Sequence, residues 1–210
     1  MFGIEKKELK ILKKLKTPRK IQDFINKIRI NFEEDGDTNL SPMSVLEKNT
    51  CHCLEGAVLA ALALRVNGYP ALLIDLKAND YDHDHVVAVF KKHSKWGAIS
   101  KTNHATLRYR DPIYNSIREL AMSYFHEYYD EYGDKNMRSY SVPVNLKIFD
   151  KKGWMATKEE VGYISKYLDK VKHFPILGRK QIANLRKADK IQLKTDKIVE
   201  WKSKKGQWYL

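Results

Sequence analysis

The sequence has few cysteines, no cluster of glycines and no long apolar run. Its two cysteines, Cys51 and Cys53, are two positions apart, and this spacing does not suit an ordinary structural disulfide. The ten glycines are scattered, so a glycine-rich phosphate-binding loop is excluded. The most apolar stretch, 56–64, is far shorter than the roughly 20 residues that span a bilayer. We therefore expect a protein with reduced thiols and no transmembrane segment, in a cytoplasmic setting.

A leader segment is not expected either, because the first residues lack an apolar core and a small-residue cleavage site. Hydrophobic residues make up 43% of the 210 positions, which is ordinary for an ordered globular protein. We expect a core with N-terminal helices over 1–150. Residues 151–210 are expected to form a basic, helical C-terminal extension that packs on this core.

The net charge of +13 is unevenly distributed. Residues 1–31 carry ten Lys or Arg against three acids, residues 151–210 carry sixteen against six, and the middle of the chain is mildly acidic. Basic ends of this kind suit either solvated helix faces or an acidic partner. Nucleic-acid binding is not expected, because the basic residues do not combine with clustered aromatic residues into one face.

Three helix starts are indicated by a capping residue followed by proline, at Thr17-Pro18, Ser41-Pro42 and Asp111-Pro112. The third is expected to begin a helix that runs to about Tyr132. Between the second and the third, the pattern changes to strands. Stretches rich in apolar and β-branched residues predict strands at 69–77, 85–91 and 96–100.

Cys53 begins the most apolar part of the chain. Residues 56–64 contain no charge and are followed by Asn67 and Gly68, which predicts a helix buried on nearly all sides, with Asn49 or Thr50 as its cap. A thiol in the first turn of a helix lies near unpaired backbone N–H groups, and these favour the thiolate. Cys53 is therefore a candidate nucleophile, and His85 on the second predicted strand is the candidate base.

This arrangement resembles the transglutaminase-like superfamily of papain-like cysteine enzymes. Four segments within about residues 41–110 carry the resemblance: 53–57 (CLEGA), 65–70 (RVNGYP), 85–90 (HVVAVF) and 96–100 (WGAIS). Two later stretches, 108–114 and 138–143, are similar to those of uncharacterised bacterial members. The resemblance implies an α+β fold in which the helix that carries Cys53 packs on an antiparallel sheet.

The resemblance also implies the chemistry. Cys53 would attack an amide carbonyl of a peptide or protein, and His85 would move the proton, without a cofactor. Either water or an amine could resolve the acyl-enzyme, so hydrolysis and acyl transfer both remain open.

The third member of the site departs from the family pattern. Ser100 stands where the family has an aspartate that orients the imidazole. A hydroxyl accepts the imidazole N–H but supplies no charge. Asn103 is a second candidate for this role and Asp111 a third, although Asp111 has the expected task of capping a helix. A Cys–His dyad or an inactive site is the remaining alternative.

Two other readings compete with the enzyme. A metal site could draw on Cys and His ligands, from the set Cys51, His52, Cys53, His83, His85 and His104. Its Cys-x-Cys spacing does not match usual structural zinc sites, so no metal is expected. The second alternative is a non-catalytic module of the same fold that binds an acidic partner through its basic ends.

Overall fold

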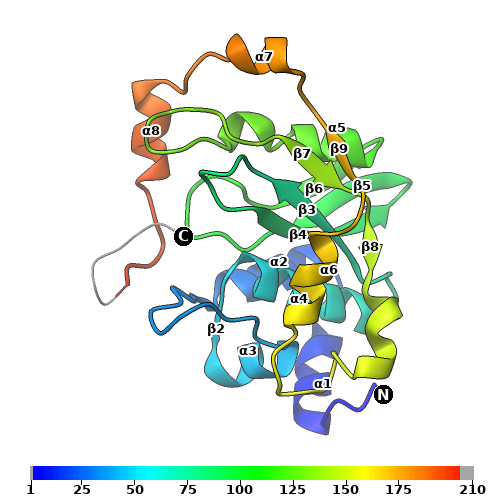
Figure 1. Ribbon diagram of the computed structural model, residues 1–210. Coiled ribbons are helices and arrows are strands. Elements are labelled where there is room, and N and C mark those ends of the chain that lie inside the picture. The colour runs from blue at the N-terminus through cyan, green and yellow to red at the C-terminus, as the bar shows by residue number, and fades with distance from the viewer. Residues whose placement is uncertain (1, 204–210) are drawn as a thin grey trace.

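The computed structural model describes residues 2–203, in which helices pack on an antiparallel sheet, an α+β arrangement (Figure 1). The helices are α1 (Lys6–Lys14), α2 (Pro18–Asn26), α3 (Pro42–Lys48), α4 (Cys53–Val66), α5 (Ile117–Met122), α6 (Gly162–Leu168), α7 (Arg179–Ala183) and α8 (Lys190–Asp196), with 3₁₀ turns η1 (Phe125–Glu127) and η2 (Leu146–Lys152). The strands are β1 (Arg29–Ile30), β2 (Thr50–Cys51), β3 (Leu72–Lys77), β4 (His85–Lys92), β5 (Lys95–Ile99), β6 (Arg110–Tyr114), β7 (Ser139–Ser141), β8 (Val144–Asn145) and β9 (His173–Pro175).

The main sheet has the strand order β6-β5-β4-β3-β7-β9, and β8 also pairs with β3. All of its pairs are antiparallel. The three predicted strands correspond to β3, β4 and β5. In the register of β3 with β4, Leu76 lies opposite His85 and Asp75 opposite Val86, so the polar ends of these strands meet at one end of the sheet.

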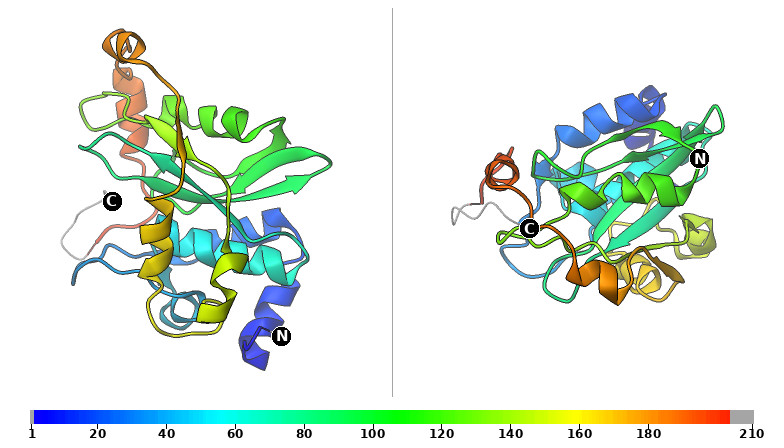
Figure 2. Two further views of the ribbon diagram at one scale, coloured as in Figure 1. Left: turned by 45° about the vertical axis from the view of Figure 1, so that its right-hand side comes forward. Right: turned by 90° about the horizontal axis from the view of Figure 1, so that it is seen from above.

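Helix α4 is the centre of the larger of two apolar clusters. It packs on β4 and is contacted by α1, α2 and α3, which lie on the same side of the sheet, whereas α5 covers the other side (Figure 2). Every residue of α4 from Leu54 to Leu64 is buried. The prediction of a helix buried on nearly all sides is confirmed, and the reason is that its apolar residues meet helices and sheet in every direction.

Two of the three predicted helix starts are confirmed. Thr17 accepts a hydrogen bond from the Lys20 N–H at the start of α2, and Ser41 accepts one from the Ser44 N–H at the start of α3. The third is wrong, because residues 110–114 form the strand β6. This strand lies at the edge of the sheet, where Pro112 removes no hydrogen bond to an outer neighbour.

The segment after residue 150 contributes to the main sheet as well as to helices. Helix α6 lies on the α4 side, and the chain then returns as β9, which pairs with β7 from Ser139 to Ser141. Among the helices described in residues 2–203, none has the length and apolar character needed to cross a bilayer.

Candidate active site

Cys53 is the first residue of α4, at the N-terminus of the helix, and is half-buried. Its thiol faces the carbonyl oxygen of Asp84 at 3.9 Å. Cys53 and His85 line the same pocket, which has a volume of about 770 Å³. The nucleophile predicted from the sequence is thus accessible to a ligand.

Hydrogen bonds around Ser100 determine which ring nitrogen of His85 carries a proton. The Ser100 hydroxyl donates to the Leu107 carbonyl at 2.5 Å, because a carbonyl oxygen only accepts. The same Oγ lies 2.8 Å from Nε2 of His85, so it accepts a hydrogen bond from an Nε2–H. Nδ1 is then the unprotonated nitrogen of a neutral His85, and it is the nitrogen left to take the Cys53 proton.

A second histidine, His52, directly precedes Cys53, interacts with its thiol and caps α4. Its Nδ1 accepts from the Leu54 N–H at 3.3 Å, and Glu55 completes a capping box by accepting from the His52 N–H at 3.0 Å. The expected caps, Asn49 and Thr50, are wrong, because the chain forms the short strand β2 (Thr50–Cys51) before the helix begins. Sequence reasoning missed this role of His52, although the His-x-x-Glu spacing fits a capping box in which histidine replaces the usual serine or threonine.

Glu55 is a buried carboxylate held by several donors. It accepts from the Leu40 N–H at 2.8 Å and from the Thr38 hydroxyl at 2.7 Å, and it lies 3.4 Å from Nε2 of His52. Burial raises the pKa of Glu55, but His52 and the other donors outweigh burial and hold this pKa at about 2. Glu55 is therefore a fixed negative charge next to His52 in the first turn of α4, where the partial positive charge of the helix N-terminus also favours it.

The charges around Cys53 favour the thiolate. Burial raises the pKa of the Cys53 thiol, but the hydrogen bonds and charges of His52 and His85 outweigh burial and lower this pKa well below its usual value. For His52, burial lowers the pKa, whereas interactions with Cys53 and Glu55 raise it to about 11. Nε2 of His52 already carries a proton, because it donates to the Thr38 carbonyl at 3.1 Å. A second proton must therefore go to Nδ1. Nδ1 then no longer accepts from the Leu54 N–H and interacts with the thiolate of Cys53 instead.

Cys51 is a different kind of thiol. It is fully buried, and burial raises its pKa to about 12. Its neighbour Lys101 is buried too and donates to the carbonyls of Ile25 and Ile28 at the end of α2. A Cβ at Gly56 would lie 2.6 Å from Cβ of Lys101, so the first turn of α4 needs glycine where this lysine crosses it. Cys51 is therefore a core residue.

The other sequence candidates lie elsewhere. Asn103 is buried and exchanges two hydrogen bonds with the backbone of Trp201, at 2.9 and 3.0 Å, and Asp111 is exposed on β6. The position beside His85 is occupied by Ser100. His83 is exposed, and His104 bonds to Asp196, so the six cysteines and histidines form no metal cluster within residues 2–203.

Sequence reasoning also missed Gln22. This side chain is buried on α2 and contacts Ser100. The sequence does place this glutamine among the apolar residues of one helix face. Because a buried amide requires hydrogen-bond partners, this position indicates a polar contact in the core.

No protein family matches the sequence, and no curated protein matches it at a significant level. The arrangement itself is a thiol at a helix N-terminus that interacts with two histidines, and a hydroxyl fixes the tautomer of one of them. A set of groups like this can form a thiolate and pass its proton to a leaving group.

Proposed function

We propose that this protein is a cysteine-dependent acyl-transfer enzyme of the transglutaminase-like, papain-like type, acting on an amide of a peptide or protein. The observation that carries the proposal is the hydrogen-bond chain from His85 through Ser100 to Leu107. This chain assigns the proton of neutral His85 to Nε2 and leaves Nδ1 as a base for Cys53.

In the proposed reaction, Sγ of Cys53 attacks the carbonyl carbon of the amide while Nδ1 of His85 holds the thiol proton. The tetrahedral intermediate collapses when the C–N bond breaks and His85 gives this proton to the departing amine. The acyl group is then a thioester on Cys53. Water would release an acid and a second amine would release a new amide, and in both cases His85 takes a proton from the attacking group and returns it to the thiolate.

The negative oxygen of the tetrahedral intermediate needs donors, and the start of α4 supplies them. The first N–H groups of a helix have no partner within the helix, and together they carry its partial positive charge. The backbone N–H of Cys53 is the first proposed donor. The Leu54 N–H becomes the second when Nδ1 of His52 is protonated and no longer accepts from it.

A direct test is the rate at which iodoacetamide alkylates Cys53 as a function of pH, followed by mass spectrometry of the peptide. We expect Cys53 to react below pH 7, where an ordinary thiol with a pKa of about 8.5 reacts slowly. Cys51 in the same peptide is the internal control, because burial should keep it unreactive. His85→Ala should weaken the reaction at low pH.

If Cys53 instead titrates like an ordinary thiol and does not respond to His85→Ala, the enzyme proposal is wrong. The alternative would then be a non-catalytic member of the same fold, whose basic ends engage an acidic partner. That module would show salt-sensitive association with an acidic protein.

A further inference from the structure

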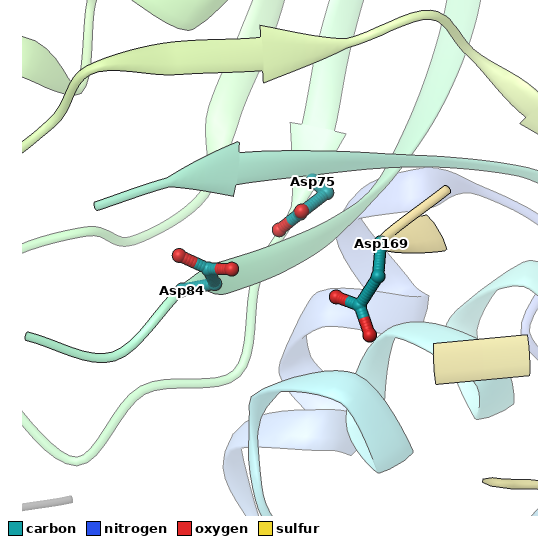
Figure 3. Close-up of side chains that lie close together, drawn as sticks. All are labelled: Asp75, Asp84 and Asp169. Atoms are coloured by element: carbon teal, nitrogen blue, oxygen red, sulfur yellow. The ribbon is translucent and has the colours of Figure 1, made fainter. Parts of the chain in front are cut away.

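Three aspartates meet in the pocket that also contains Cys53. Asp75 comes from β3, Asp84 directly precedes β4, and Asp169 is the last residue of the α6 region. One carboxylate oxygen from each lies within 4.8 Å of the other two. Figure 3 shows the three carboxylates facing one another across a common space.

Asp75 is the buried member of this cluster and has an unsatisfied oxygen. Its side chain is only 3% exposed, and Oδ1 has no hydrogen-bond partner within residues 2–203. Burying a carboxylate oxygen without a partner is costly. The unsatisfied oxygen therefore indicates that this carboxylate has a ligand which the polypeptide does not provide.

The other oxygen of Asp75 shares a proton with His173. Nδ1 of His173 donates to the Val171 carbonyl at 2.8 Å, and Nε2 lies 3.1 Å from Oδ2 of Asp75. Nδ1 must carry a proton, because a carbonyl oxygen only accepts. The bond between Nε2 and Oδ2 needs a second proton, which belongs either to Nε2 or to the carboxyl group of Asp75. The pair of Asp75 and His173 is thus neutral as a whole.

The remaining charges leave the cluster negative. Lys77 lies 3.5 Å from Oδ2 of Asp84, with 41% of its side chain exposed, so it offsets that carboxylate only in part. Asp169 adds a further negative charge from an exposed position.

We propose that Asp75, Asp84 and Asp169 bind a divalent cation, calcium in preference to magnesium. Carboxylate oxygens are the ligands that hard cations prefer. Calcium takes six to eight oxygen ligands in flexible geometry, whereas magnesium keeps several waters and usually binds through one or two carboxylates. A site with three carboxylates therefore favours calcium.

This cation would be close to the proposed nucleophile. The carbonyl of Asp84 faces the Cys53 thiol, and His85 is the next residue. A cation held by Asp84 would fix the chain just before β4, and with it the position of the imidazole.

The test is calorimetric titration of the full chain with calcium chloride, and with magnesium chloride in parallel. We expect saturable binding of one Ca²⁺ per chain, with Mg²⁺ weaker. Asp169→Asn, an exposed substitution that leaves the core intact, should weaken Ca²⁺ binding by about tenfold or more, since it removes a charged ligand. Asp75→Asn should act in the same direction.

Asp37→Asn is the matched control, because Asp37 is exposed and lines the same pocket outside the cluster, and it should bind Ca²⁺ like the unmodified protein. The proposal is overturned if no saturable Ca²⁺ binding occurs, or if Asp169→Asn and Asp37→Asn have equal effects. Cys53→Ala should keep its Ca²⁺ affinity, so this result is separate from the outcome of the alkylation test.

Discussion

Gln22 on α2 makes two hydrogen bonds to the backbone of Ser100. Its Nε2 donates to the Ser100 carbonyl at 2.8 Å, and its Oε1 accepts from the Ser100 N–H at 2.9 Å. Both residues are buried. The hydroxyl that orients His85 is therefore fixed by a residue 78 positions earlier in the chain.

Gln22→Leu tests this dependence. The substitution leaves the N–H and carbonyl of Ser100 buried without partners, which should lower the free energy of unfolding by about 2 kcal/mol. Urea denaturation measures this change, and alkylation of Cys53 at pH 6 should slow in the folded variant. Asn26→Ala is the control, since it removes another partner of the Gln22 amide but neither bond to Ser100; an equal slowing in both variants would contradict the prediction.

Ser100→Ala removes the acceptor of the His85 Nε2–H. Without it, the imidazole is no longer held in the tautomer that presents Nδ1 to Cys53, and we expect alkylation at pH 6 to slow by roughly tenfold, by analogy with other orienting groups. Ser100→Thr keeps the hydroxyl and should retain most of the rate. An unchanged rate in Ser100→Ala would mean that Ser100 has no positioning role.

His52 has two roles that a pair of variants separates. His52→Asn keeps an acceptor for the Leu54 N–H but removes the ring that becomes cationic, so it should raise the pKa of Cys53 with little loss of stability. His52→Ala should raise the same pKa and also cost about 1 kcal/mol through the lost cap. The pH profile of alkylation and the urea midpoint measure the two effects. Equal pKa values of Cys53 in both variants and the unmodified protein would exclude an electrostatic role for His52.

The buried carboxylate of Glu55 predicts a specific pH dependence of stability. Its pKa is about 2 in the folded protein, against an ordinary value of 4.5. Since the folded state binds this proton more weakly than the unfolded state, the contribution is complete above the ordinary pKa and is lost as the pH falls toward 2. It is on the order of 3 kcal/mol.

Denaturant titrations between about pH 5 and pH 2.5 check this dependence on Glu55. The Glu55→Gln variant should be less stable at pH 5 and show a flatter decline than the unmodified protein. Glu159→Gln, at an exposed position, should follow the unmodified protein. Parallel curves for all three proteins would show that Glu55 does not carry the effect.

Local patterns were sufficient to predict the buried helix, the three central strands and the caps at Thr17 and Ser41. The local pattern failed at Asp111-Pro112, because a capping residue followed by proline also fits an edge strand. Only the strand order of the sheet reveals which strand lies at the edge. The helix there begins later, at Ile117, with Ser116 as its cap.

The site could be predicted only where its residues are close in the sequence. Cys53, His85 and Ser100 come from consecutive elements around one helix and two adjacent strands, so their order along the chain suggested their proximity. Gln22 reaches Ser100 from α2, and Asp169 reaches the pocket from the end of α6. Their positions depend on packing between elements far apart in sequence, which no local pattern encodes.

The two neighbours of β3 have a consequence for synthesis of the chain. β4 follows β3 after a short loop, but β7 and β8, which cover its other edge, come more than 60 residues later. A nascent chain that has not yet released residues 139–145 therefore presents the hydrophobic strand β3, Leu72–Lys77, with one open edge. During that interval the polypeptide is prone to pair with other strands, and a chaperone that shields this edge would raise the yield of native protein.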